Sequence, residues 1–251
     1  MSAFDAFFEG LRAVVSVEIE KDYANNPDGA LKVIKNRLFN LPDEKSGDVK
    51  HTRDQQMFYR VWWSFIEIHA TYQALLDHEI YMARFPFRKT RLTPPRHLRH
   101  VIESYLNEIY ILYERINAFL TILERLYRAD ARGKAIAAES HALRESAGKA
   151  LKTFVNVRGG HIHKARFHND DLLRLDALDS LLRERASDDV SRSLKPYYAT
   201  ESRRIRTFWK QHLSRNNTNA KELLDTIFSK LQPHVFTRDG QFRYAVPANR
   251  D

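Results

Sequence analysis

Hydrophobic residues recur every three or four positions along most of the chain, which is the spacing of an amphipathic α-helix. The pattern is clearest over residues 4–24, 54–83 and 95–128. The last two stretches are about 30 residues each, or about 45 Å long as helices, and we expect them to form an antiparallel pair at the core. Ser2 and Thr93 stand just ahead of the first and third stretches, where helix caps are expected.

Weaker apolar patterns in the second half of the chain predict further helices with breaks between them. A looser segment over residues 130–138 precedes a helix that the Gly159-Gly160 pair should disturb. Asn169, followed by two aspartates, predicts the capped start of another helix. The last helical stretch should cover residues 196–213, pause at Asn216-Asn217 and resume over residues 219–231.

Shorter segments stand apart from these long helices. Residues 30–39 predict a short helix, and residues 42–53 predict a polar surface loop. Beyond His234, the residues on both sides of Asp239-Gly240 predict a small β-hairpin. We therefore expect an all-α fold in a single domain over residues 1–251. It should be an up-and-down bundle of long helices, with extra N- and C-terminal helices and this C-terminal hairpin.

Composition narrows the chemistry. The chain has no cysteine, which excludes disulfides, zinc–thiolate sites, iron–sulfur clusters and thiol nucleophiles. No secretory signal and no apolar stretch of about 18 residues is visible, so we expect a cytoplasmic protein without a membrane partner. The 41 Lys and Arg residues exceed the 32 Asp and Glu residues, giving a net charge of +9. This charge favours an anionic partner such as nucleic acid or an acidic protein.

One short segment carries the candidate chemistry. Arg158 and His163 are separated by four residues, two of which are Gly159 and Gly160. An imidazole can move a proton near pH 7, and a guanidinium can hold a phosphate oxygen as negative charge builds on it. The pair therefore suits phosphodiester cleavage, and the two glycines would let the backbone approach a phosphate closely.

An arginine and a histidine with four to six residues between them, near the C-terminal end of a four-helix up-and-down bundle, resemble the signature of the HEPN superfamily (higher eukaryotes and prokaryotes nucleotide-binding). The apolar approach over Leu151–Val157 is similar to that family's signature region, and so is the Arg-Phe pair after the histidines. The segment Tyr105–Tyr110 resembles the long core helices of bacterial members. The resemblance covers a bundle at about residues 54–185 and leaves the N-terminal helices and a C-terminal extension, about residues 190–251, unmatched.

The resemblance implies a metal-independent endoribonuclease that uses no cofactor. Arg158 would stabilise the pentacoordinate phosphorane. His163 would act as base on the 2′-hydroxyl or as acid on the leaving oxygen, leaving a 2′,3′-cyclic phosphate. His161 is the reserve for this role, and Lys164 and Arg166 would contact the RNA.

Family members usually dimerise so that two Arg–His pairs face one groove, which implies a homodimer here. The implied setting is bacterial defence, a toxin–antitoxin pair or RNA turnover, with an antitoxin or another protein as a further partner. Gly159 stands where the family most often has a small polar residue such as asparagine, and several members are non-catalytic. The alternative is therefore a helical module that binds a nucleotide, RNA or a protein partner.

The same segment also contains residues that are common metal ligands. They are His161, His163, His168, Asp170 and Asp171. A His-x-His pair can grip a metal when it lies on a strand, because alternate residues then share a face. We predict no metal here, because the segment has the pattern of a helix or an irregular stretch and no run of strands surrounds it.

A second basic segment lies farther along the chain. Arg203-Arg204-Ile205-Arg206 precedes Phe208 and Trp209, and this mixture of phosphate-binding and base-stacking side chains suits single-stranded RNA. Arg203, Arg204 and Arg206 are therefore candidate RNA contacts. The competing interpretation, which we favour, is an amphipathic helix in which Ile205, Phe208 and Trp209 belong to the core.

Overall fold

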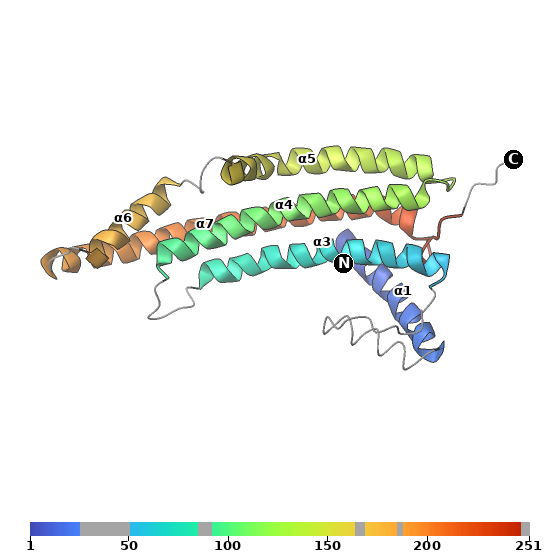
Figure 1. The fold of residues 1–251 in the computed structure, drawn as a ribbon, viewed down its shortest axis with the longest axis horizontal. Helices are drawn as coiled ribbons and strands as arrows, with labels where there is room; N and C mark the ends of the chain where they lie inside the picture. The colour runs from blue at the N-terminus through green and yellow to red at the C-terminus, as the bar shows by residue number, and fades with distance from the viewer. Residues whose placement is uncertain (26–50, 85–91, 164–168, 185–187, 247–251) are drawn as a thin grey trace. The chain divides into compact units, whose positions relative to one another are not determined.

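The structure is a computed structural model that describes residues 1–25, 51–84, 92–163, 169–184 and 188–246. Every described element is a helix, which confirms the all-α expectation (Figure 1). The helices are α1 (Ala3–Asn25), α3 (Arg53–Ala83), α4 (Pro94–Tyr127), α5 (Gly133–His163), α6 (Asp170–Glu184) and α7 (Asp188–Val235). The short helix and most of the loop predicted between α1 and α3 lie outside the described residues. Within the described ranges, no helix has both the length and the apolarity needed to cross a lipid bilayer.

Polar side chains begin four of the helices. Ser2 accepts a hydrogen bond from the Asp5 backbone ahead of α1, at 3.3 Å. Ahead of α3, the backbone N–H of Thr52 donates to Gln55 Oε1, whose own backbone N–H donates to Thr52 Oγ1. The Thr93 hydroxyl lies ahead of α4, and Asn169 Oδ1 accepts from the Leu172 backbone ahead of α6. These contacts confirm the predicted caps at residues 2, 93 and 169 and explain why the helices begin there.

Two of the predicted helix breaks are wrong. Helix α5 begins at Gly133, inside the segment expected to be loose, and continues through Gly159-Gly160 to His163. Helix α7 continues through Asn216-Asn217 without a pause. Glycine costs a helix about 1 kcal/mol relative to alanine, which a helix of this length tolerates. Asn217 does not interrupt α7, because its side chain bonds to α3 and α4 rather than to its own backbone.

The predicted C-terminal β-hairpin is also wrong. The chain does reverse at Asp239-Gly240, where Gly240 has a φ of +81°. Phe236 and Phe242 form an isolated antiparallel bridge across this turn, and no strand is present among the described residues. The physical reason is that α7 extends to Val235, so almost no chain remains between the helix and the turn to form a strand.

The chain divides into two compact units. Unit 1 comprises residues 1–67, 117–145 and 224–251, and unit 2 comprises residues 68–116 and 146–223. Four of the helices, α3, α4, α5 and α7, contribute residues to both units.

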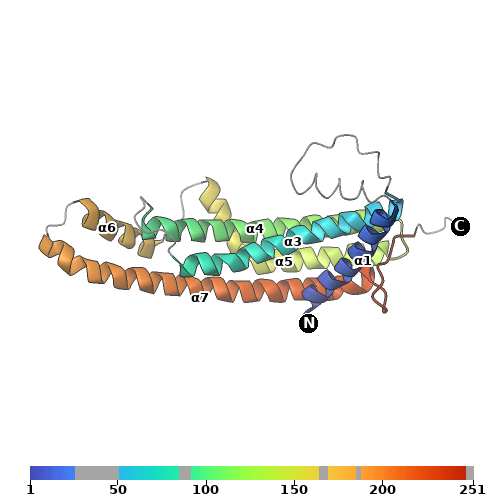
Figure 2. The same cartoon turned by 90° about the horizontal axis from the view of Figure 1, so that it is seen from below.

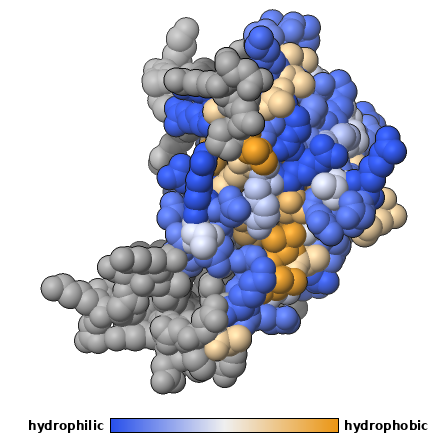
Figure 3. All heavy atoms as spheres, turned by 90° about the vertical axis from the view of Figure 1, so that its right-hand side faces the viewer, coloured by the Kyte–Doolittle hydropathy of each residue, from blue (hydrophilic) through white to orange (hydrophobic). Residues whose placement is uncertain are grey.

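Phenylalanine rings fill the centre of unit 1. They are supplied by α1, α3, α4, α7 and the segment after α7, and neighbouring ring centroids lie 4.7–6.4 Å apart. The residues are Phe4, Phe7, Phe65, Phe119, Phe228 and Phe236, and none is more than 4% exposed. In Figures 1 and 2, α1 lies across the first half of α3, and the stacked Phe8 and Trp62 rings join the two helices. The end of unit 1 drawn in Figure 3 is mostly hydrophilic around a small hydrophobic centre.

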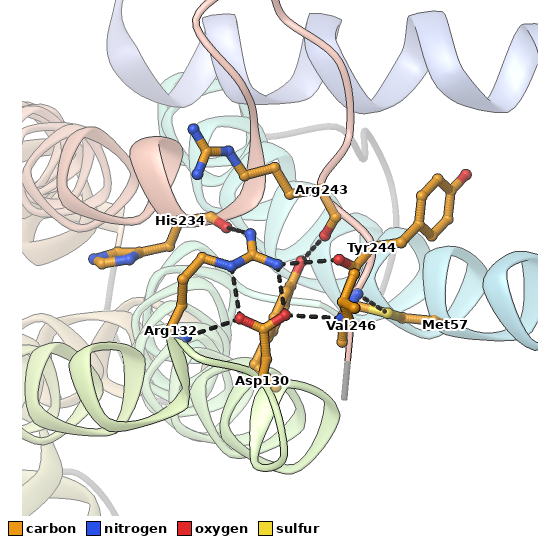
Figure 4. A network of polar contacts seen from close by, with 9 residues as sticks. Met57, Asp130, Arg132, His234, Arg243, Tyr244 and Val246 are labelled. Atoms are coloured by element: carbon orange, nitrogen blue, oxygen red, sulfur yellow. Dashed lines mark hydrogen bonds and ion pairs between the residues drawn. The ribbon is translucent and has the colours of Figure 1, made fainter. Parts of the chain in front are cut away.

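A network of hydrogen bonds holds the last described residues against unit 1 (Figure 4). Arg132 donates to both oxygens of Asp130, and it also donates to the backbone carbonyls of His234 and Tyr244 at 3.0 Å each. Asp130 Oδ2 accepts from the Val246 backbone at 2.9 Å. The Asp130 side chain is 5% exposed, and the Arg132 guanidinium beside it holds the pKa of its carboxyl well below the usual range. We call Asp130, Arg132 and the segment 243–246 the C-terminal clamp.

In unit 2, α3 and α4 run antiparallel, as predicted. His97 near the start of α4 contacts the carbonyls of Tyr81 and Arg84 at the end of α3. Farther along α4, Arg115 donates to the Thr71 hydroxyl of α3 at 2.6 Å. Helix α6 packs against α7, where Asp171 and Asp179 of α6 bond to residues of α7.

Candidate functional site

The predicted cleavage residues Arg158, His161 and His163 all lie in the last turns of α5. The structure describes the backbone of this stretch, and the side chains are outside its described part. Lys164 and Arg166, the predicted RNA contacts beside them, lie outside the described residues altogether. The relative positions of Arg158, His161 and His163 therefore follow from the helix register of α5.

The continuous helix changes which of these residues are neighbours. Positions three apart in an α-helix lie next to each other on its surface, so Arg158 and His161 share a face of α5. Positions five apart lie about 140° apart around the helix axis, so Arg158 and His163 fall on different sides of α5. Within one chain, the register therefore favours His161 over His163 as the neighbour of Arg158.

The three predicted RNA-binding arginines of α7 lie on two flanks of that helix rather than on one. Arg203 and Arg206 are three positions apart and share one flank, whereas Arg204 shares the other flank with Phe208. Arg204 forms ion pairs with Asp171 of α6 and with Glu201, each at 2.9 Å. These two acidic partners raise its pKa, Glu201 foremost. Arg203 and Arg206 have no ion pair with any residue that the structure describes.

Aromatic rings gather on the Arg204 flank. Phe208 and His212 are one turn apart, with ring centroids 4.3 Å apart. Trp209 lies beside them, 5.9 Å from Phe208 and 6.1 Å from His212. Arg215 follows His212 at the next position on the same flank and is exposed. We call Arg204, Phe208, His212 and Arg215 the α7 stripe.

The prediction that Ile205, Phe208 and Trp209 all belong to the core is partly wrong. Ile205 is 1% exposed, as expected for a core residue, but Phe208 is 43% exposed and Trp209 is half-buried. The reason lies in the course of α5. Ala150 and Leu151 of α5 line a pocket with Asn219 and other residues of α7. Beyond that point, the last turns of α5 turn away from α7 (Figures 1 and 2), and Phe208, earlier on α7, is exposed.

A buried polar cluster in unit 2 was not predicted from the sequence. Asn217 is 2% exposed, and its amide nitrogen donates to the Leu75 carbonyl and to Glu79 Oε1, at 3.2 Å and 2.7 Å. The Tyr105 hydroxyl donates to Asn217 Oδ1 at 2.9 Å. Burial raises the pKa of Tyr105, which keeps this phenol protonated as a donor. One signal for this cluster was present, because Asn217 occupies the helix position that apolar residues fill elsewhere on the buried face of α7.

Candidate metal ligands do not gather in the part of the chain that the structure describes, where no group of three or more His, Asp or Glu side chains has suitable geometry. That absence does not extend to the His161-x-His163 pair, whose side chains the structure does not describe. Comparisons with protein-family models, with curated protein sequences and with solved structures found no significant match to this chain.

Proposed function

We propose that this protein is a metal-independent endoribonuclease whose chemistry is carried by Arg158 and a histidine of the His161-Ile162-His163 segment. The observation that supports the proposal most directly is the continuous course of α5, because it places Arg158 and His161 one turn apart on one helix face. The resemblance to HEPN proteins supports the same assignment and favours His163.

The proposed reaction needs only groups that this segment supplies. The imidazole takes the proton of the 2′-hydroxyl, and the resulting oxygen attacks the adjacent phosphorus. The guanidinium of Arg158 holds the phosphate oxygens while the P–O5′ bond breaks. The imidazolium gives up its proton and the leaving 5′-oxygen gains one, so the products are a 2′,3′-cyclic phosphate and a 5′-hydroxyl end, and the histidine returns to its neutral form.

The test is cleavage of labelled RNA in excess EDTA, with product ends identified. Arg158→Ala should lower the rate sharply, and loss of the catalytic histidine should cost about 10²- to 10⁴-fold, the usual contribution of general acid–base catalysis. Arg192→Ala and His141→Ala are matched controls, because both residues are exposed and lie outside the proposed site. Unchanged cleavage in Arg158→Ala, His161→Ala and His163→Ala would overturn the assignment.

Mixing variants distinguishes a site within one chain from a site shared by two copies. If Arg158 works with His163 of a second copy in a homodimer, mixing Arg158→Ala with His163→Ala should restore cleavage, because one intact pair re-forms. If Arg158 works with His161 of its own chain, no intact pair can form in the mixture of Arg158→Ala and His161→Ala. The helix register of α5 favours the second result.

The second candidate function is a non-catalytic module that binds RNA, a nucleotide or a protein partner. The exposed aromatic and basic residues of the α7 stripe favour RNA binding within this class. RNA binding by wild-type protein, with no cleavage of several RNAs, would support this alternative over the endoribonuclease. An antitoxin, another protein partner and a cytoplasmic location stay predictions.

A further inference from the structure

The α7 stripe combines exposed aromatic surface with one arginine, Arg215, that forms no ion pair with any described residue. Phe208 is 43% exposed and lies against the His212 ring at 4.3 Å between centroids. Residues 202–220 contain five Lys or Arg residues and no Asp or Glu. Arg215 has no ion pair within the described residues, whereas Arg204 is held by Asp171 and Glu201. The stripe therefore has stacking rings at its centre and a guanidinium at each end.

We propose that the α7 stripe holds single-stranded RNA, with a base stacked on Phe208 and an adjoining phosphate bound by Arg215. This rests on the proposed function, because it takes RNA to be the substrate. A single strand fits better than a duplex, because its unpaired bases offer open faces to an aromatic ring. Phosphate binding by arginine adds affinity that does not depend on sequence.

The chain course brings the proposed cleavage segment to the same part of unit 2. Leu151 lies beside Asn219 near one end of the stripe, and Asp171 bonds to Arg204 at the other end. These two positions on α7 are 15 residues apart, or about 22 Å along the helix. The two ends of the stripe therefore lie near α5 and α6, the helices that come before and after residues 164–168 in the chain.

The pattern of α7 argues against an apolar protein partner at this surface. An apolar docking face needs hydrophobic residues three and four positions from Phe208, on the same side of the helix. At these positions Ile205 is buried, Arg204 and Gln211 are exposed, and His212 is half-buried, and Arg215 is exposed farther along the same side. A lone aromatic group framed by cations suits a nucleic-acid strand better.

The test measures binding separately from cleavage. A labelled single-stranded DNA of about 12 nucleotides, a length within the usual site sizes, has no 2′-hydroxyl and so cannot be cut by the proposed reaction. Its fluorescence anisotropy should show binding by the full-length protein. Phe208→Ala should weaken binding about five- to 150-fold, the range for loss of one stacked base. Phe208→Leu should weaken it similarly, whereas Phe208→Trp should preserve it, because only the tryptophan keeps an aromatic face.

Two matched controls sharpen the result. Tyr197→Ala removes another exposed aromatic residue of α7, 54% exposed and outside the stripe, and should bind as wild type. Arg215→Ala should weaken binding and lower the slope of log affinity against log salt by about 0.7, as for one lost phosphate contact on a single strand. Arg203→Ala removes an equal charge from the other flank and should have the smaller effect.

Three outcomes would overturn the proposal: no binding by wild type, wild-type binding by Phe208→Ala and Phe208→Leu, or equal losses in Arg203→Ala and Arg215→Ala. Circular dichroism of each variant checks that α7 is still folded. The result is independent of the cleavage test. If the protein binds the strand through Phe208 but cuts no RNA, the binding proposal holds and the endoribonuclease proposal is wrong. If it cuts RNA but its binding does not depend on Phe208, the endoribonuclease proposal holds and the binding proposal is wrong.

Discussion

The interiors of the two units are built in different ways. In unit 1, six phenylalanine rings from five segments pack against one another, and each ring can adjust to its neighbours. In unit 2, α7 meets α3 and α4 through hydrogen bonds of Asn217, which have fixed partners. A shift of α7 by one turn would still bury apolar area in unit 1, but in unit 2 it would leave buried polar groups without partners. Both units bury apolar side chains, but unit 1 is centred on phenylalanine rings, whereas in unit 2 the polar cluster sets the register of α7.

The largest expected effect comes from breaking the phenylalanine cluster. Phe228 is fully buried and contacts Phe4, Phe7, Phe65 and Phe119. Phe228→Ala should lower the free energy of unfolding by about 3–5 kcal/mol, because it removes apolar contacts and leaves a cavity. Urea denaturation followed by circular dichroism measures this change. Phe228→Leu should cost clearly less, and equal losses in the two variants would contradict the cavity explanation.

The polar cluster of unit 2 should show a smaller but more specific effect. Asn217→Ala leaves the Tyr105 hydroxyl and the Leu75 carbonyl short of a partner, and we expect a loss of about 2–3 kcal/mol. In a double-mutant cycle, Tyr105→Phe combined with Asn217→Leu should cost less than the two single changes added together. Strict additivity would show that the two side chains do not depend on each other.

The C-terminal clamp gives unit 1 its own polar contact, with a predictable dependence on pH. Asp130→Asn should cost about 1–1.5 kcal/mol at pH 7, the difference between a charged and a neutral hydrogen bond. The native pKa of Asp130 is lowered, chiefly by Arg132, so the stabilisation is present above the unfolded pKa of about 3.9 and is lost as pH falls below it. Urea unfolding at pH 7 and near pH 3 should show the wild type and Asp130→Asn converging in acid. A difference in the free energy of unfolding that is the same at both pH values would contradict this role of Asp130.

The smallest expected effect on stability belongs to the α7 stripe. Phe208→Ala and Arg204→Ala should each change the free energy of unfolding by less than about 0.5 kcal/mol, because neither side chain is buried in a core. Thermal unfolding checks this directly. A larger loss would mean that the stripe is structural, and it would weaken the interpretation of the binding experiments.

The sequence predicted the helices better than their ends and breaks. The helices over residues 53–83 and 94–127 were predicted within one residue, because their apolar stripes are long and their caps and prolines are local signals. The breaks at Gly159-Gly160 and Asn216-Asn217 were wrong, because local preference gave way to tertiary contacts and to helix length. Asn217 shows this most clearly, since its partners Leu75, Glu79 and Tyr105 are far away in the sequence.

The candidate site was less accessible to sequence reasoning than the fold. Helical spacing alone places Phe208 on the edge of an amphipathic helix, and it cannot tell whether another helix covers that edge. Whether that edge is buried depends on where α5 stops packing against α7, and this is set by tertiary structure. The spacing of Arg158 and His163 was visible in the sequence, but their register on one continuous helix was not, because the glycines predicted a break there.

The composition of unit 1 has a consequence for how the protein is made. Its core joins Phe4 and Phe7 with Phe228 and Phe236, which follow them by more than 220 residues in the chain. Protein synthesis adds about 5–20 residues per second, so more than about 10 s pass between the synthesis of the α1 rings and that of their partners. During that time an apolar helix is exposed on an unfinished chain. Until the end of α7 emerges, the apolar face of α1 is therefore open to misfolding or to chaperone binding.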